Sequence, residues 1–188
     1  AFKPNCWVRT KITSREGDKE QVAWEDRVLE AADDTTVTLR VEIVVGEQSN
    51  SRQDKLGKTR NDMLTYIGAE ELEVEGTQYA CVVQEFKELK LKDWMIKEGP
   101  YAGWVSLKQV HEQGEATRTT VVKKLSREKM KVRDLEFDCI RFESEVETAI
   151  GDKKLTETHR TWICESMTGT IVRFESEGTG LSGKPVFR

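Results

Sequence analysis

Short stretches of alternating apolar and polar residues recur along the chain. The clearest is residues 37–43, where valine, leucine and isoleucine alternate with threonine, arginine and glutamate. A period of two is the signature of a strand with one buried face. Residues 21–25 and 173–176 are likewise short, mixed and rich in strand formers. Sustained 3.6-residue periodicity is scarce, so the pattern predicts an all-β chain built from antiparallel strands.

One interruption of this strand pattern is expected. Asp62 could cap a short helix over residues 62–67. Residues 49–60 are polar and include Gly57, a composition typical of an exposed loop. Residues 47–67 are therefore interpreted as an insertion into the strand pattern.

An internal similarity is the most informative feature of the sequence. Residues 70–82 and 128–140 share glutamate at the first position, valine at the fifth and cysteine at the twelfth, and six positions agree in type without a gap. Each block is followed by a tryptophan, Trp94 or Trp162, and later by a glycine that leads into a new strand. Two amphipathic hairpins can look alike by chance, but the conserved order of features favours duplication.

The beginning and the end of the chain extend this series. Trp7-Val8 with Lys11 and Gly17 has the same spacing as Trp104-Val105 with Lys108 and Gly114, and a third copy starts at Thr170 and ends at Gly180. The sequence therefore predicts one β domain, residues 1–188, that consists of two related halves, about 1–102 and 103–188.

The strands on either side of Gly151 can be paired by arithmetic. Gly151-Asp152 suits a two-residue hairpin turn, so the numbers of opposite residues sum to 303. The pairs expected are Glu143 with Arg160, Arg141 with Trp162, Ile140 with Ile163, Cys139 with Cys164 and Ser144 with His159. An opposite-charge pair and a cation over an indole are both favourable cross-strand neighbours.

An antiparallel meander of about eight to ten strands follows from these pairings. Because almost no helix is available to cover it, the sheet must curve into a half-barrel or barrel, or split into two packed layers. Large aromatic residues would line the concave side or the seam. The candidate ligand-facing residues are Trp7, Trp94, Trp104 and Trp162. Buried core material is the alternative role for them.

Composition excludes several classes of protein. The chain has 188 residues with 37% hydrophobic and 34% charged residues, which argues against disorder. No apolar run approaches the roughly 20 residues that a transmembrane helix needs. The net charge of -4 argues against a general nucleic-acid binder.

The residues that could carry chemistry form no recognisable catalytic, cofactor or metal site. Cys6, Cys81, Cys139 and Cys164 are too widely spaced for a metal site. The glycine-rich run 178–184 imitates a phosphate-binding loop, but too few residues follow it for a helix. His159 opposite Ser144 could form a proton-transfer pair, or simply a surface pair. No catalytic residue, cofactor or metal ligand is therefore predicted.

The motif Val132-x-x-x-x-Phe137-x-Cys139, followed by a strand with Trp162 and then by Gly169-x-Ile171-Val172-Arg173, resembles bacterial exported domains of unknown function related to the half-barrel lipoprotein carriers of the periplasm. A proline commonly precedes the turn glycine in that family. Here Pro100 takes this place in the first copy and Met167-Thr168 in the second. The resemblance implies an antiparallel sheet curved around an apolar face, with no enzymatic residues to carry over.

The function expected from these features is that of a non-enzymatic exported module that binds an apolar small molecule or a protein partner on its curved sheet. A structural or interaction domain without a ligand cavity is the alternative, and an enzyme that uses His159 with nearby acids is a third. The start at Ala1 fits a mature exported protein or a trimmed chain. A place in the cell envelope is thus an expectation, and the cytoplasm stays open.

Overall fold

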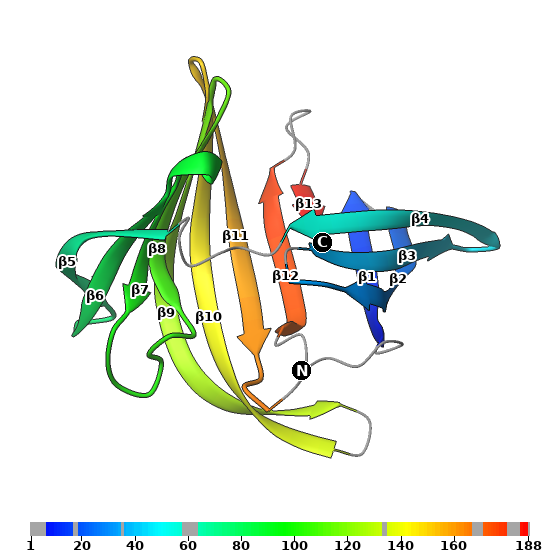
Figure 1. Cartoon of the computed structure of the whole chain (residues 1–188), viewed down its shortest axis with the longest axis horizontal. Coiled ribbons are helices and arrows are strands. Elements are labelled where there is room, and N and C mark those ends of the chain that lie inside the picture. The colour runs from blue at the N-terminus through cyan, green and yellow to red at the C-terminus, as the bar shows by residue number, and fades with distance from the viewer. Residues whose placement is uncertain are drawn as a thin grey trace. The chain divides into compact units, whose positions relative to one another are not determined.

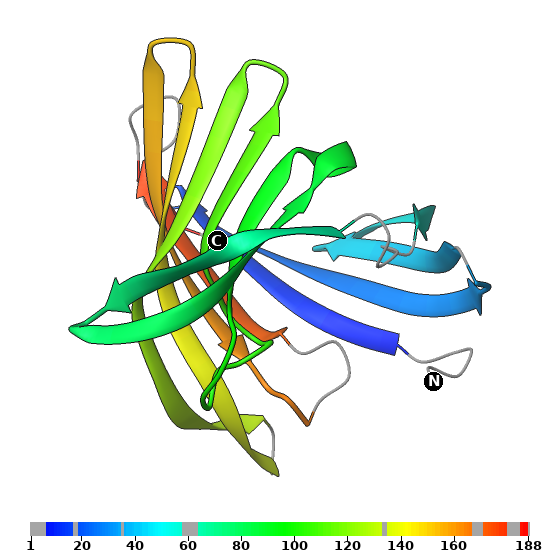
Figure 2. The same cartoon turned by 60° about the vertical axis from the view of Figure 1, so that its left-hand side comes forward.

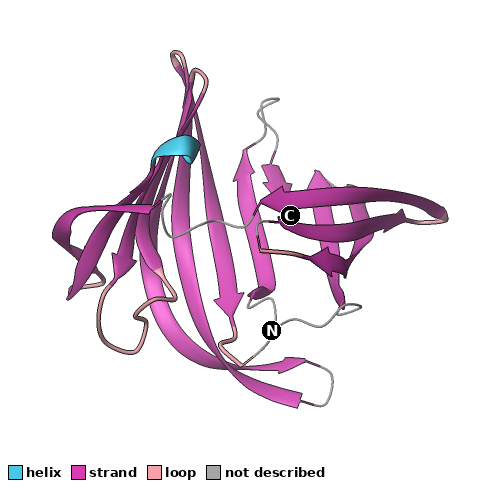
Figure 3. Cartoon of the chain, in the orientation of Figure 1, coloured by secondary structure: helices cyan, strands magenta, loops and turns pink. Residues whose placement is uncertain are grey.

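The computed structural model describes residues 7–16, 19–34, 36–57, 64–132, 135–166, 171–179 and 185–187. Within these ranges nearly all regular structure is antiparallel strand (Figure 3), and one 3-10 turn, Lys87–Leu89, is the only helical segment. The prediction of an all-β antiparallel meander is confirmed.

The chain divides into two compact units. The first comprises Ala1–Arg60 with Val186–Arg188, and the second comprises Asn61–Pro185. The predicted halves, 1–102 and 103–188, are defined by sequence similarity and not by compactness, and they stay a prediction. The strands on either side of residue 102 pair within one sheet.

The first unit contains a four-stranded meander. Its strands are β1 (Trp7–Glu16), β2 (Lys19–Ala32), β3 (Thr36–Val45) and β4 (Gln48–Gly57), and the short β13 (Pro185–Phe187) pairs with β1. The loop predicted at residues 49–60 is wrong for residues 49–57, which lie in β4, and residues 58–60 lie outside the described residues. Polar residues are compatible with a strand here because side chains such as Arg52 and Gln53 are exposed.

The second unit contains eight strands, each paired antiparallel with the next (Figure 1). They are β5 (Leu64–Val74), β6 (Thr77–Phe86), β7 (Leu91–Ile96), β8 (Ser106–Gln113), β9 (Ala116–Val132), β10 (Leu135–Ile150), β11 (Lys153–Ile163) and β12 (Ile171–Thr179). The helix predicted at residues 62–67 is wrong from Leu64 onward, where β5 begins, and residues 62 and 63 lie outside the described residues. Leu64 pairs with Phe86 in the β5–β6 ladder, and this tertiary pairing overrides a weak local cap signal.

The eight-stranded sheet is strongly curved (Figure 2) but does not close into a barrel. Curvature brings β5 close to β9, although three strands separate them in the sheet. The main core gathers buried side chains from β5 to β10. Its buried members are Val74, Cys81, Val83, Trp94, Ile96, Val105, Leu107, Val122 and Ile140. A second, smaller cluster consists of Cys139, Trp162 and Cys164.

The register predicted for β10 and β11 is confirmed. The observed partners include Ile140 with Ile163, Arg141 with Trp162, Glu143 with Arg160 and Ser144 with His159, so the numbers sum to 303 along the ladder. The predicted third copy is placed differently. Residues 171–179 form β12, which pairs with β11 as the last strand of the second copy.

Candidate functional site

The duplication predicted from sequence is a repeat of four strands. In the first copy, β5–β8, Glu70 lies opposite Cys81, and in the second copy, β9–β12, Glu128 lies opposite Cys139. The tryptophan of each copy lies opposite a cation on the following strand, and the ladder is irregular immediately after it in both copies. The two copies therefore share their register as well as their sequence pattern.

Each tryptophan is held by a carboxylate and two cations. Trp94 Nε1 donates a hydrogen bond to Glu70 Oε2 over 2.6 Å, and Lys92 and Lys108 lie 4.9 and 4.6 Å from the centre of its ring. Such cation–π contacts stabilise an indole whose ring face is covered by the cationic side chains.

The second copy repeats this arrangement with arginines. Trp162 Nε1 donates to Glu128 Oε1, and Arg141 and Arg173 lie 5.5 and 4.9 Å from its ring. We call the sets Glu70–Cys81–Trp94 and Glu128–Cys139–Trp162 the Trp–Glu–Cys motifs. The cation over Trp162 that the sequence predicted, Arg141, is therefore present.

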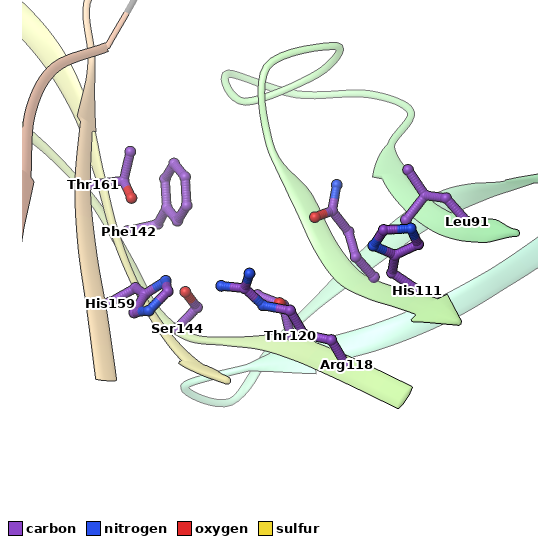
Figure 4. A pocket seen from close by; sticks show the side chains of 9 residues that line it. Leu91, His111, Arg118, Thr120, Phe142, Ser144, His159 and Thr161 are labelled. Atoms are coloured by element: carbon purple, nitrogen blue, oxygen red, sulfur yellow. The ribbon is translucent and has the colours of Figure 1, made fainter. Parts of the chain in front are cut away.

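An open pocket of about 360 Å³ lies on one face of the second unit (Figure 4). Its lining combines an aromatic and an aliphatic side chain with amide, hydroxyl and basic groups. The lining residues are Leu91, Gln109, His111, Arg118, Thr120, Phe142, Ser144, His159 and Thr161. The pocket is therefore more polar than the expected apolar carrier cavity.

Strand pairing explains how these side chains come together. His111 lies opposite both Leu91 and Arg118, and Ser144 lies opposite His159. Residues that are directly opposite point to the same face of a sheet, and successive residues point to opposite faces. Five strands, β7 to β11, thereby contribute to one surface.

The same alternation places the two motif tryptophans on the other face. Thr161 lines the pocket, so its neighbour Trp162 points away, and Trp94 has the opposite parity to Leu91 on β7. Both indoles are buried. Trp104 is 37% exposed in the turn before β8, and the side chain of Trp7 lies outside the described residues. None of the four candidate tryptophans is among the residues that line this pocket, and their ligand-facing role stays a prediction.

Arg118 supplies the permanent positive charge of the pocket. Its side chain is exposed, and in Figure 4 the guanidinium points toward Ser144 and His159. Across the ladder it faces His111 on β8 and Thr148 on β10, neither of which is acidic. No acidic side chain among the described residues forms an ion pair with Arg118.

His159 is held by Glu157 on its own strand and by Phe174 on β12. Its Nε2 lies 2.9 Å from Glu157 Oε2, and its ring packs edge-on against Phe174 with centroids 5.0 Å apart.

Ser144 is 2% exposed and faces His159, as the sequence predicted. Within the described part of the chain, however, no hydrogen bond joins the Ser144 hydroxyl to the His159 ring. A nucleophile activated by a base needs such a bond.

A buried carboxylate lies beside the pocket but is already satisfied. Asp93 is 3% exposed and accepts hydrogen bonds from Gln84 Nε2 at 2.9 Å and Gln109 Nε2 at 3.2 Å. The first of these amides belongs to β6 and the second to β8, so Asp93 links three adjacent strands. This network orients Gln109, whose side chain also lines the pocket.

The predicted proximity of Cys139 and Cys164 is reflected in the chemistry of their thiols. Both belong to the smaller buried cluster, and both are free cysteines. Burial raises the pKa of the Cys139 thiol, and the neighbouring Cys164 thiol raises it further. Burial also raises the pKa of Cys81 to about 11. The thiols of Cys81 and Cys139 are therefore protonated near neutral pH and react slowly as nucleophiles.

Other classes of site find no support in the part of the chain that the structure describes. It contains no group of three or more side chains arranged to hold a metal ion. It also contains no helix of the length and apolarity needed to cross a membrane. No family model, curated protein or solved structure matches this chain.

Sequence reasoning found only part of the pocket. His159 and Ser144 were paired in advance by the hairpin arithmetic, whereas Arg118, Gln109 and Thr120 were missed. Their strands meet through the β8–β9 hairpin at the turn Gly114, for which the sequence pattern indicated only a spacing from Trp104 and no strand pairing. Pairing outward from that turn would have placed Arg118 opposite His111.

Proposed function

We propose that the second unit is a non-enzymatic binding module that takes up a small molecule in the open pocket of its curved sheet. The pocket itself is the observation that carries this proposal. Its volume of about 360 Å³ falls within the range of about 300–1,000 Å³ typical of small-molecule sites. Such sites combine apolar walls with a few polar groups that orient the ligand.

The lining indicates an amphipathic ligand rather than a wholly apolar one. Phe142 and Leu91 offer apolar contact, whereas Ser144, Thr161 and Gln109 offer hydroxyl and amide groups. A purely aliphatic ligand would remove water from these polar groups without replacing their hydrogen bonds. A ligand with one apolar and one polar end matches the lining better.

Titration calorimetry with three ten-carbon probes tests the proposal: sodium decanoate, 1-decanol and decyltrimethylammonium chloride. We expect saturable binding of at least one probe with a negative heat-capacity change, because apolar surface is buried. Thr120→Phe should abolish the binding by filling the pocket.

Thr119→Phe is the matched control. Thr119 directly precedes Thr120 on β9, so it points to the opposite face, and it is buried to a similar degree. Equal binding by both variants would place the site elsewhere. No saturable binding of any probe by the native chain would refute the proposal.

An interaction domain is the second candidate, and the first unit favours it. Among its described side chains Leu29 and Val41 are buried, whereas Trp24 remains 42% exposed on β2. Exposed tryptophan is enriched at protein interfaces. A Trp24→Ala variant that loses a protein partner without losing the ten-carbon probes would assign the interaction to the first unit.

A further inference from the structure

We propose that the ligand of this pocket is an anionic amphiphile whose carboxylate or phosphate group binds the guanidinium of Arg118. This inference rests on the proposed function, because it names the chemical class of the ligand at that same pocket. It goes further by assigning one residue to the head group.

The ion pairs of the described arginines single out Arg118. Every other arginine whose side chain is described has an acidic partner within 4 Å. They are Arg9, Arg27, Arg40, Arg52, Arg127, Arg141, Arg160 and Arg173. Arg118 has no such partner among the described residues, yet it lines the pocket.

The acidic groups near the pocket are occupied by other side chains. Glu157 contacts His159, and Asp93 accepts hydrogen bonds from Gln84 and Gln109. Glu147, which follows Val146 on β10, pairs with Lys154 at 3.0 Å. No described carboxylate is therefore placed to neutralise Arg118.

The surroundings of Arg118 favour an anion further. His111 faces it directly across the β8–β9 ladder, and His159 lines the same pocket. Neither imidazole carries negative charge, and an imidazole ring N–H can donate a hydrogen bond to an anion. A guanidinium presents its donors as a fork that matches the two oxygens of a carboxylate or phosphate.

The apolar part of the ligand has its own place in the lining. Phe142 lies on β10, two residues from Ser144, and Leu91 lies on β7 opposite His111. An alkyl chain that starts at Arg118 meets these apolar side chains within the same pocket. The charged head and the apolar tail are thus both accommodated.

The test compares probes of different charge on the native chain and on charge variants. We expect sodium decanoate and decyl phosphate to bind at least roughly tenfold more tightly than 1-decanol and decyltrimethylammonium, because a charge-assisted hydrogen bond is at stake. Arg118→Gln should weaken decanoate binding roughly ten- to a hundredfold and leave 1-decanol unchanged. Arg118→Lys should recover part of the loss.

Lys123→Gln is the matched control, because it removes one positive charge from an exposed side chain of the same strand that does not line the pocket. Equal losses for Lys123→Gln and Arg118→Gln would show a general effect of net charge and overturn the inference.

The remaining outcomes separate the head group from the pocket. If 1-decanol binds as tightly as decanoate and Thr120→Phe abolishes both, the pocket is retained and the anionic ligand is refuted. If inorganic phosphate bound as tightly as decyl phosphate, the alkyl tail would contribute nothing to binding. This result would refute an amphiphilic ligand. Failure of all probes would overturn both proposals.

Discussion

The two copies of the four-strand repeat differ in what surrounds the same motif. In the first copy Trp94 and Cys81 belong to the main core, with buried residues from several other strands. In the second copy Trp162 and Cys139 form a small cluster with Cys164 alone as a further buried member. Both tryptophans are equally buried and both donate to a glutamate. The local register determines the motif, whereas the rest of the fold determines how much core is built on it.

The largest expected effect on the free energy of unfolding comes from removing one of the two indoles. Trp94→Ala and Trp162→Ala should each lower the free energy of unfolding by roughly 3–5 kcal/mol, because a large buried aromatic side chain is removed. We expect the Trp94 variant to lie at the upper end, since its cavity opens within the main core. Urea unfolding followed by far-UV circular dichroism measures both.

If either alanine variant does not fold, Trp94→Phe and Trp162→Phe give the same comparison. Each should lower the free energy of unfolding less than the alanine variant does, because less of the side chain is removed. A larger loss at Trp162 than at Trp94 in both pairs of variants would contradict the view that the main core depends more on the first copy.

The next largest effect is expected from a disulfide that can form in the second copy but not in the first. Cys81 faces Ile96, whereas Cys139 and Cys164 come directly after the last β10–β11 pair, Ile140 with Ile163, and their thiols interact. Oxidised glutathione should convert these two thiols to one disulfide and be reduced to two molecules of glutathione. A bridge that closes a 25-residue separation stabilises by roughly 3.5 kcal/mol in the chain-entropy view.

Peptide mapping without reduction detects the bridge between Cys139 and Cys164. Ile96→Cys should add a second bridge, to Cys81, because it recreates the pair of the second copy. Cys139→Ser is the control that must abolish the first bridge. Separate glutathione adducts on Cys139 and Cys164, with no bridge, would show that the thiols are not opposed.

Stability above pH 9 should depend on Cys81. Burial raises its pKa from 9.0 to about 11 in the folded chain. The thiol is neutral when protonated, so its contribution is fully present below pH 9 and is lost as the pH rises toward 11. At pH 10.5 the loss should approach roughly 2 kcal/mol.

Cys81→Ala removes this titration, so its own stability should fall less between pH 8 and pH 10.5 than that of the native chain. Urea unfolding at the two pH values measures the difference. Parallel losses in the two proteins would show that the Cys81 thiol does not carry the effect.

The glutamate of the Trp–Glu–Cys motif should contribute about equally to the free energy of unfolding in the two copies. Glu70→Ala and Glu128→Ala each remove the acceptor of an indole N–H, and we expect losses of about 1–2 kcal/mol. Glutamine retains an oxygen acceptor, so Glu70→Gln and Glu128→Gln should cost less. Urea unfolding of all four variants tests this, and a glutamine variant as destabilised as its alanine counterpart would argue against the hydrogen bond.

The features that the sequence revealed are those with local or periodic causes. The alternation of residues 37–43 and the turn at Gly151 depend on neighbours in the chain, and both led to strands that the structure confirms. The 58-residue similarity also corresponds to a shared register. In each case the determining interactions repeat at a fixed spacing.

The features that the sequence did not reveal depend on distant pairing. Residues 49–57 are polar enough for a loop, yet they form β4 because β3 supplies a ladder of hydrogen bonds. Arg118 lies in a strand of mixed polarity, and its role follows only from the register of β8 and β9. Placing a polar side chain in a pocket requires the pairing of five strands, which no local pattern contains.

The smallest expected effect concerns the cations over the two indoles. The first copy uses Lys108 and the second uses Arg173 at the position opposite the tryptophan. Replacing either with glutamine should cost about 0.5–1 kcal/mol, the usual value for an exposed cation–π contact. Lys97→Gln, at an exposed position outside the motif, should cost close to nothing. Because an arginine can stack its plane on a ring, the Arg173 variant should lose slightly more. Urea unfolding of the three variants measures the loss in free energy of unfolding. If the Lys108 and Arg173 variants lost no more than Lys97→Gln, the cations would lie over the indoles without stabilising the fold.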